Sequence, residues 1–161
     1  MNYLQLEKMI KSPDKENVYL AVSIIRSKTL NIPPGKASKL LLEVPLEHRI
    51  RDYKDICEEL GEKELTLKHF RSIPVYLKVR LLARTQLEQI AKLVNREYKV
   101  DWKNKDQYKW YPYFEFAVGR GLVFRISHGD GHYFNGLVAF KDRPTSDFVG
   151  KTFTSIYEKL M

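Results

Sequence analysis

The stretch YPYFEFAVGRGLVFRISHGDGHYFNGLVAF, residues 111–140, decides the class of fold. Its first aromatic residues, Tyr111 and Tyr113, alternate with a second set on the opposite face, namely Pro112, Phe114 and Phe116. A period of two is typical of a β-strand with one buried face. The glycines of GRG and HGDG favour tight hairpin turns. The sequence therefore predicts a three-stranded antiparallel meander, with strands over residues 111–118, 121–127 and 132–140.

Helical patterns precede this stretch. Residues 3–11 and 14–30 predict two helices, the second capped by Ser12 or Asp14 with Pro13 in its first turn. The segment NIPPG, residues 31–35, ends that helix because proline lacks an N–H group. Apolar residues recur at helical spacing in residues 47–61, where Gly61 is typical of a helix C-terminus.

Two longer helical patterns lie closer to the meander. Residues 74–95 predict one helix with a single apolar stripe, formed by Ala83, Leu87, Ile90, Ala91 and Val94. Residues 146–160 predict a closing helix that packs on the sheet. Helices, then a meander, then a helix indicate an α+β domain. A length of 161 residues and 43% hydrophobic content fit one domain. Residues 1–44 are expected to form a helical segment that is either part of this domain or peripheral to a core of residues 45–161.

The composition predicts a cytoplasmic protein without a membrane partner. No secretion signal is recognised at the start of the sequence. The longest uncharged apolar run, VYLAVSII from Val18, is far shorter than the roughly 20 residues that cross a bilayer. The single cysteine, Cys57, excludes an internal disulfide and fits a reducing compartment, where we interpret it as a small core residue.

The net charge of +8 is concentrated in one segment. Residues 68–109 contain 11 Lys or Arg against 4 Asp or Glu, whereas residues 1–61 contain 10 against 9. A concentrated basic face favours polyanions such as nucleic acid, and it equally suits an acidic protein partner or a solvated helix face.

The segment DWKNKDQYKWYPYFEF, residues 101–116, combines three of these lysines with seven aromatic residues. Aromatic side chains that stack on bases, beside cations that follow the phosphates, are typical of single-stranded nucleic-acid binding. In a half-buried strand, however, one set of rings faces the core, so Phe114, Phe116 and either Trp102 or Trp110 are expected to be structural. The candidate binding residues are Lys103, Lys105, Tyr108, Lys109, Trp110 and Tyr111, with Arg80, Arg84 and Arg96 as a supporting face.

Enzymatic chemistry finds less support. The motif GKT at Gly150 lacks the earlier glycine of a phosphate-binding loop, because Thr145 occupies that position, so Gly150 is expected to be a close-packing position in a helix. His128, Asp130 and His132 in HGDGH suggest a metal-dependent hydrolase as a third hypothesis, although Asp-Gly is also a favoured hairpin turn. We expect a non-catalytic protein without a metal or cofactor.

From about residue 45 onward, the order of RIRDYKDICEELG, LEQIAKLVN, DWKNKDQYKWYPYFEF and FVGKTFTSIYEKL resembles an uncharacterised family of small proteins from Bacteroidetes phages, prophages and related mobile elements. The resemblance implies a phage-type accessory protein in the cytoplasm of a bacterial host cell. It implies no reaction, cofactor or binding residue. Residues 1–44 have no counterpart in it.

The leading hypothesis from the sequence is a protein that binds single-stranded nucleic acid, or nucleic acid without sequence preference, through the basic aromatic segment. The alternative is a protein-interaction module that modulates a host or phage factor through the same aromatic surface, since Tyr, Trp and Arg are also enriched at interface hot spots.

Overall fold

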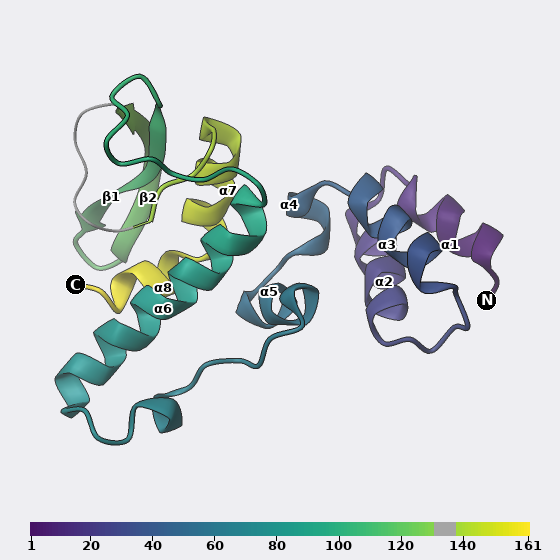
Figure 1. The fold of residues 1–161 in the computed structure, drawn as a ribbon, viewed down its shortest axis with the longest axis horizontal. Helices are drawn as coiled ribbons and strands as arrows, with labels where there is room; N and C mark the ends of the chain where they lie inside the picture. Colours follow the sequence, from purple (N-terminus) through teal and green to yellow (C-terminus); the bar gives the residue numbers. More distant parts are fainter. Residues whose placement is uncertain (131–137) are drawn as a thin grey trace. The chain divides into compact units, whose positions relative to one another are not determined.

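Figure 1 shows the chain in a computed structural model, which describes residues 1–130 and 138–161. The described residues form eight α-helices, one 3-10 helix and a two-stranded antiparallel sheet, which confirms the α+β class. The chain divides into two compact units, Met1–Arg51 and Asp52–Met161. The number of domains that fold independently stays a prediction.

The first unit is made of short helices: α1 (Tyr3–Ile10), α2 (Lys15–Arg26), α3 (Pro34–Glu43) and α4 (Leu46–Arg49). At the start of α1, the N–H of Asn2 donates to Oε1 of Gln5 and the N–H of Gln5 donates to Oδ1 of Asn2. Asp14 caps α2 by accepting a hydrogen bond from the N–H of Glu16 at 3.0 Å. Pro13 precedes this cap, so its predicted place in the first turn is wrong.

The hydrophobic core of the first unit includes eight buried side chains: Leu6, Ile10, Val18, Ala21, Val22, Ile25, Leu40 and Val44. Leu40 belongs to α3 and Val44 directly follows its last residue. The sequence pattern did not predict this helix. Helix α2 ends at Arg26, so the predicted extension to residue 30 and the predicted stop at NIPPG are wrong. Pro34 is instead the first residue of α3, where a missing N–H group costs nothing.

The helix predicted over residues 47–61 is divided in two. Ile50 has extended backbone, and Asp52 then begins α5 (Tyr53–Leu60) by accepting a hydrogen bond from the N–H of Asp55 at 3.0 Å. The Asp52 side chain thus caps the first turn of α5, so a new helix begins there and the predicted continuous helix is interrupted. Gly61 ends α5 with φ of 65°, as predicted. Cys57 on α5 is buried, which confirms it as a core residue, and burial raises the pKa of its thiol.

The second unit is organised around α6 (Val75–Asn95), which follows η1 (Leu67–Phe70). The predicted stripe on this helix is confirmed, because all five of its side chains are buried: Ala83, Leu87, Ile90, Ala91 and Val94.

The sheet is a hairpin of β1 (Lys109–Ala117) and β2 (Gly121–Asp130), close to the two strands predicted first. Gly119 and Gly121 have φ of 77° and 73° in the connecting turn, where glycine avoids the strain of a side chain. Of the predicted third strand, Phe140 pairs with Trp110 through two backbone hydrogen bonds of 2.8 and 3.1 Å. Residues 138–139 are not in a strand, and residues 132–137 lie outside the described residues, so the three-stranded meander is not shown.

The closing helix is divided into α7 (Arg143–Thr152) and α8 (Thr154–Glu158), so the single helix predicted over residues 146–160 is wrong. Asp142 caps α7, and Phe153 leaves helical geometry with ψ of 24°. There the hydroxyl of Thr154 donates to the carbonyl of Gly150 at 2.7 Å, a side-chain bond of the kind that bends helices.

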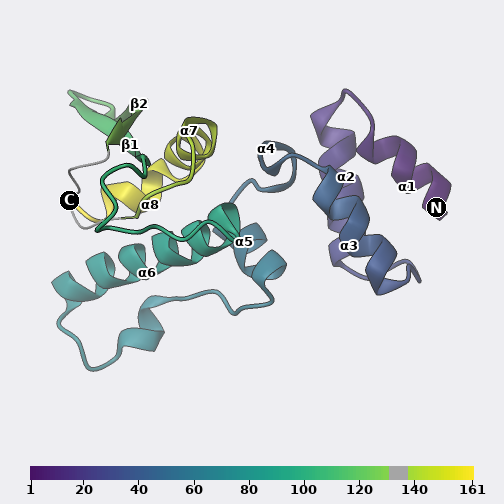
Figure 2. The ribbon, with the colours of Figure 1, turned by 45° about the horizontal axis from the view of Figure 1, so that its top comes forward.

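Helices α7 and α8 cover one face of the hairpin, and α8 also contacts α6 (Figure 2). Gly150 permits this packing, because a Cβ added there would lie 2.4 Å from the ring of Phe124 and 2.8 Å from Pro112. Phe114 packs on Tyr157 with ring centroids 4.6 Å apart. The pKa of Tyr157 is raised by burial. Phe116 was expected in the core but is 79% exposed, because near the turn α8 packs on β2, where Leu122 is buried, and leaves the end of β1 uncovered.

Candidate nucleic-acid interface

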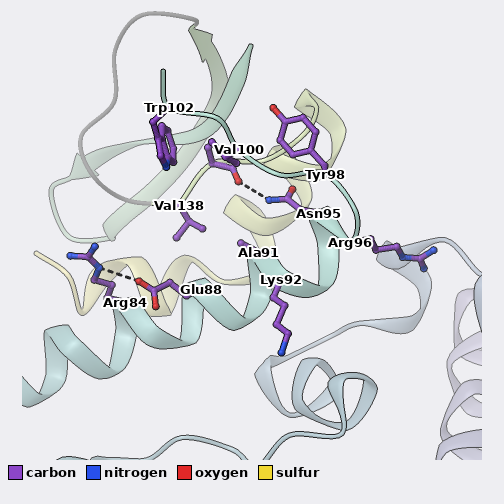
Figure 3. A pocket seen from close by; sticks show the side chains of 11 residues that line it. Arg84, Glu88, Ala91, Lys92, Asn95, Arg96, Tyr98, Val100, Trp102 and Val138 are labelled. Carbon is purple, nitrogen blue, oxygen red and sulfur yellow. Dashed lines mark hydrogen bonds and ion pairs between the residues drawn. The ribbon is translucent and has the colours of Figure 1, made fainter. Parts of the chain in front are cut away.

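A groove of about 530 Å³ runs along the second half of α6 in the second unit (Figure 3). One wall is α6 itself, and the other is formed by the chain that follows it and by Val138 and Ala139. The volume lies within the roughly 300 to 1,000 Å³ of ligand sites. The lining residues that bear on binding are Arg84, Glu88, Lys92, Asn95, Arg96 and Trp102.

Asn95 fixes the two walls to each other. Its side-chain N–H donates to the carbonyl of Ala139 at 2.8 Å, and its Oδ1 accepts from the N–H of Lys141 at 3.1 Å. The side chain is buried and uses both its donor and its acceptor, so each partner is satisfied. The groove is therefore built by a specific contact between α6 and the chain that precedes α7.

Trp102 stands on the wall opposite α6 and is 51% exposed. Its loop is held by side-chain bonds: Gln107 accepts from the N–H of Asp101 at 2.6 Å and donates to the carbonyl of Lys99 at 2.9 Å. The sequence left open which tryptophan is structural. The accessible ring is that of Trp102, which was not among the predicted binding residues.

Trp110 is the structural member of the pair. It faces Gly129 across the hairpin, and a Cβ at Gly129 would lie 2.9 Å from the Trp110 ring. The absence of a side chain at Gly129 thus makes room for the indole. Tyr111 is half-buried on the other face of β1, with its ring 6.3 Å from that of His128. Neither residue lines the groove.

Lys109 is buried, with 2% of its surface exposed. Its ammonium group donates to the carbonyl of Asn104 at 2.6 Å and to that of Gln107 at 2.8 Å. These bonds pin the loop that carries Trp102. We therefore assign Lys109 a structural role and leave it out of the surface proposed to contact phosphates.

The other predicted loop residues are exposed. Lys103 and Lys105 lie beside Trp102 in the sequence, and Tyr108 is 63% exposed. Two side-chain bonds shape the backbone here, since Asp101 accepts from the N–H of Lys103 and Asn104 accepts from that of Asp106, both at 2.9 Å. The loop thus presents its cations on a defined backbone.

The structure separates the three predicted arginines. Arg84 and Arg96 line the groove, and Arg84 lies 3.3 Å from the carboxylate of Glu88. Arg80 does not line it and donates to the carbonyl of Met161 at 2.6 Å. Lys92, not singled out by the sequence, also lines the groove and pairs with Glu62. The hydrogen bond from Lys92 lowers the pKa of the Glu62 carboxyl.

Arg96 has an unusual backbone at the end of α6. Its φ of 49° and ψ of −112° are those of the first central position of a type II′ turn, and the N–H of Tyr98 closes the turn on the carbonyl of Asn95 at 2.9 Å. Glycine is the usual residue at that position, because a side chain is strained there. Arg96 lines the end of the groove at a cost in backbone strain, with its side chain directed away from Trp102 (Figure 3).

The metal hypothesis falls partly on positions that the structure does not describe. His128 is exposed on β2, whereas His132 and the side chain of Asp130 lie outside the described residues. Among the residues that the structure describes, no group of three or more His, Cys, Asp or Glu side chains is placed to hold a metal ion.

Comparison with protein-family models, with curated proteins and with solved structures found no match for this chain. The resemblance to phage and mobile-element proteins stays a prediction. None of the described helices has the length and apolar character needed to cross a bilayer.

Proposed function

We propose that this chain is a non-catalytic protein that binds single-stranded nucleic acid in the groove on α6. The observation that carries the proposal is the half-exposed ring of Trp102, which faces a helix wall bearing Arg84 and Arg96. An unpaired base stacks on the indole and the guanidinium group of Arg84 contacts a phosphate beside it, whereas Arg96, at the other end of the groove, contacts a phosphate farther along the strand. Lys103 and Lys105 extend this contact along the loop.

The strained position of Arg96 supports this role. Folding alone favours glycine there, so the arginine is expected to be retained for a contact that its guanidinium group makes. The composition of the groove agrees, since its lining holds Arg84, Lys92 and Arg96 against Glu88. Arg84 pairs with Glu88 and Lys92 with Glu62, so both must exchange these partners to contact a phosphate. Duplex nucleic acid keeps its bases stacked on each other, so it cannot use Trp102 in the same way and should bind less tightly.

The test is fluorescence anisotropy of a labelled single-stranded oligonucleotide, titrated with the protein at two salt concentrations. Four phosphate contacts, from Arg84, Arg96, Lys103 and Lys105, predict that affinity falls about 50-fold between about 50 and 200 mM salt. Absence of binding to the single strand at the lower concentration would refute the proposal. Tighter binding of the duplex would exclude base stacking on Trp102.

Replacing Lys103 and Lys105 together by alanine should flatten this salt dependence. Each phosphate contact on a single strand contributes about 0.7 to the slope, so the fall over the same salt range should shrink to about sevenfold. The matched control is Lys8→Ala with Lys15→Ala, which removes the same charge from exposed positions of the first unit. An equal change in both double variants would show that only net charge matters.

Arg96→Gly should change stability and binding in opposite directions. Glycine fits the turn without strain, so the free energy of unfolding should rise by about 1 kcal/mol. Loss of a phosphate contact should at the same time weaken oligonucleotide binding and reduce its salt slope by about 0.7. Urea unfolding and anisotropy on the same preparation measure the two effects. If the glycine variant binds as tightly as the natural chain, Arg96 has no part in the site.

A protein partner on the same surface is the alternative, and Tyr108 and Trp102 have the exposure that an interface anchor needs. Salt separates the two functions. An interface anchored by aromatic side chains should depend weakly on ionic strength, whereas phosphate contacts should be lost steeply.

A further inference from the structure

A second surface lies at the other end of α6, away from the groove residues in sequence and outside the groove lining. There η1 leads into the first turn of α6, at one extremity of the ribbon of the second unit (Figures 1 and 2). Large apolar side chains are exposed at this end, with Val75 and Tyr76 each at 73%. We define the apolar tip as Leu67, Val75, Tyr76 and Leu77.

The apolar tip is surrounded in sequence by positive charge. Residues 65–87 contain five Lys or Arg side chains and no Asp or Glu. The four nearest to the tip in sequence form what we call the cationic collar: Lys68, Arg71, Lys78 and Arg80, the last of which also donates to the carbonyl of Met161. A soluble chain normally covers or disperses such an apolar cluster, and an uncovered one marks an interaction site.

We propose that the apolar tip inserts into the interface of an anionic lipid membrane, with the cationic collar held at the headgroups. The charges are complementary, because the leaflet surface is negative and attracts Lys and Arg. The apolar side chains then leave water by entering the headgroup and acyl boundary, as the apolar faces of interfacial helices do. This binding is peripheral and goes beyond both the proposed groove function and the sequence-based expectation of no membrane partner, which rested on spanning segments.

The arrangement of the tip favours lipid over a protein groove. Val75, Tyr76 and Leu77 are consecutive in a helix and therefore project about 100° apart, on different sides of its first turn. A flat or grooved protein partner covers one side of such a turn. A lipid interface surrounds an inserted end and covers all sides at once. A second copy of this chain is disfavoured, because its own collar carries the same charge.

Sedimentation with vesicles tests the proposal. The full chain should bind vesicles of phosphatidylcholine with about 30 mol% phosphatidylserine at low salt and bind pure phosphatidylcholine far less, since each Lys or Arg near an anionic surface contributes about fivefold to partitioning. The variant Lys68→Gln with Arg71→Gln should bind the anionic vesicles roughly 25-fold less. Failure of the natural chain to bind anionic vesicles overturns the proposal.

Insertion is tested separately from charge. Val75→Ser with Tyr76→Ser leaves the collar unchanged and should lower vesicle binding at least about tenfold, because the apolar side chains no longer enter the interface. The control is Leu4→Ser with Leu42→Ser, which replaces exposed leucines of the first unit and should leave vesicle binding unchanged. If the Val75→Ser, Tyr76→Ser protein, the tip variant, binds vesicles as well as the natural chain does, binding depends on charge alone and the proposed insertion is wrong.

The tip variant also distinguishes lipid binding from oligonucleotide binding in the groove and from binding of an acidic protein. Its oligonucleotide binding should equal that of the natural chain, because no tip residue lines the groove. If the tip variant keeps vesicle binding but loses capture of an acidic protein, the surface belongs to a protein partner and the lipid proposal fails.

Discussion

Trp102→Ala should weaken binding of a single-stranded oligonucleotide about 5- to 150-fold, the loss expected when one base–aromatic stack worth roughly 1 to 3 kcal/mol is removed. The fold should persist, because Trp102 is 51% exposed and its loop is held by bonds from other residues, including the ammonium group of Lys109. Trp102→Phe should recover part of the affinity, since a smaller ring still stacks. Anisotropy titration at constant salt measures all three proteins.

The matched control is Phe116→Ala. Phe116 is an exposed aromatic residue of the same unit that does not line the groove, so its removal should leave affinity unchanged. If both alanine variants bind equally well, the groove is not the site. If Phe116→Ala alone weakens binding, the ligand lies on the hairpin instead.

Gly150→Ala should lower the free energy of unfolding by about 3 kcal/mol, at the upper end of the usual cost of overpacking. The new Cβ would lie 2.4 and 2.5 Å from two atoms of the Phe124 ring and 2.8 Å from Pro112, so α7 must move away from the hairpin. Helix propensity acts in the opposite direction and recovers less than about 1 kcal/mol. Urea unfolding followed by tryptophan fluorescence reports on this unit, because Trp102 and Trp110 both belong to it.

Gly35→Ala is the control for this substitution. Gly35 lies in α3 with no atom within 4 Å of an added Cβ, so only the propensity gain remains and stability should stay equal or rise. Circular dichroism follows its unfolding in the first unit. A Gly150→Ala protein as stable as the natural chain would mean that α7 does not pack on the hairpin at this distance.

Local patterns in the sequence predicted the parts of the fold that depend on residue spacing and on the backbone freedom of glycine. The apolar stripe of α6 follows from helical spacing, the hairpin turn from its glycines, and the packing role of Gly150 from the failure of its motif as a phosphate loop. The interruptions of the helices at Asp52 and Phe153 were not predicted, because a side-chain bond to the backbone competes with an otherwise continuous apolar pattern.

The candidate site was predicted less well, for a physical reason. Burial of Lys109 depends on two loop carbonyls that only the folded chain brings within reach, and exposure of Trp102 depends on where that loop runs. Composition indicated the correct segment but not which face of it is accessible. Arg84 and Arg96 were predicted as a supporting face, and the structure brings them to the same groove as Trp102.

The eight buried side chains of the core described for the first unit all come from residues 6–44. A segment that closes its own core can be gained, lost or exchanged by recombination without opening a second core elsewhere in the chain. The first unit is therefore suited to exchange as a module, because the core described for it uses no side chain of the unit that carries the groove.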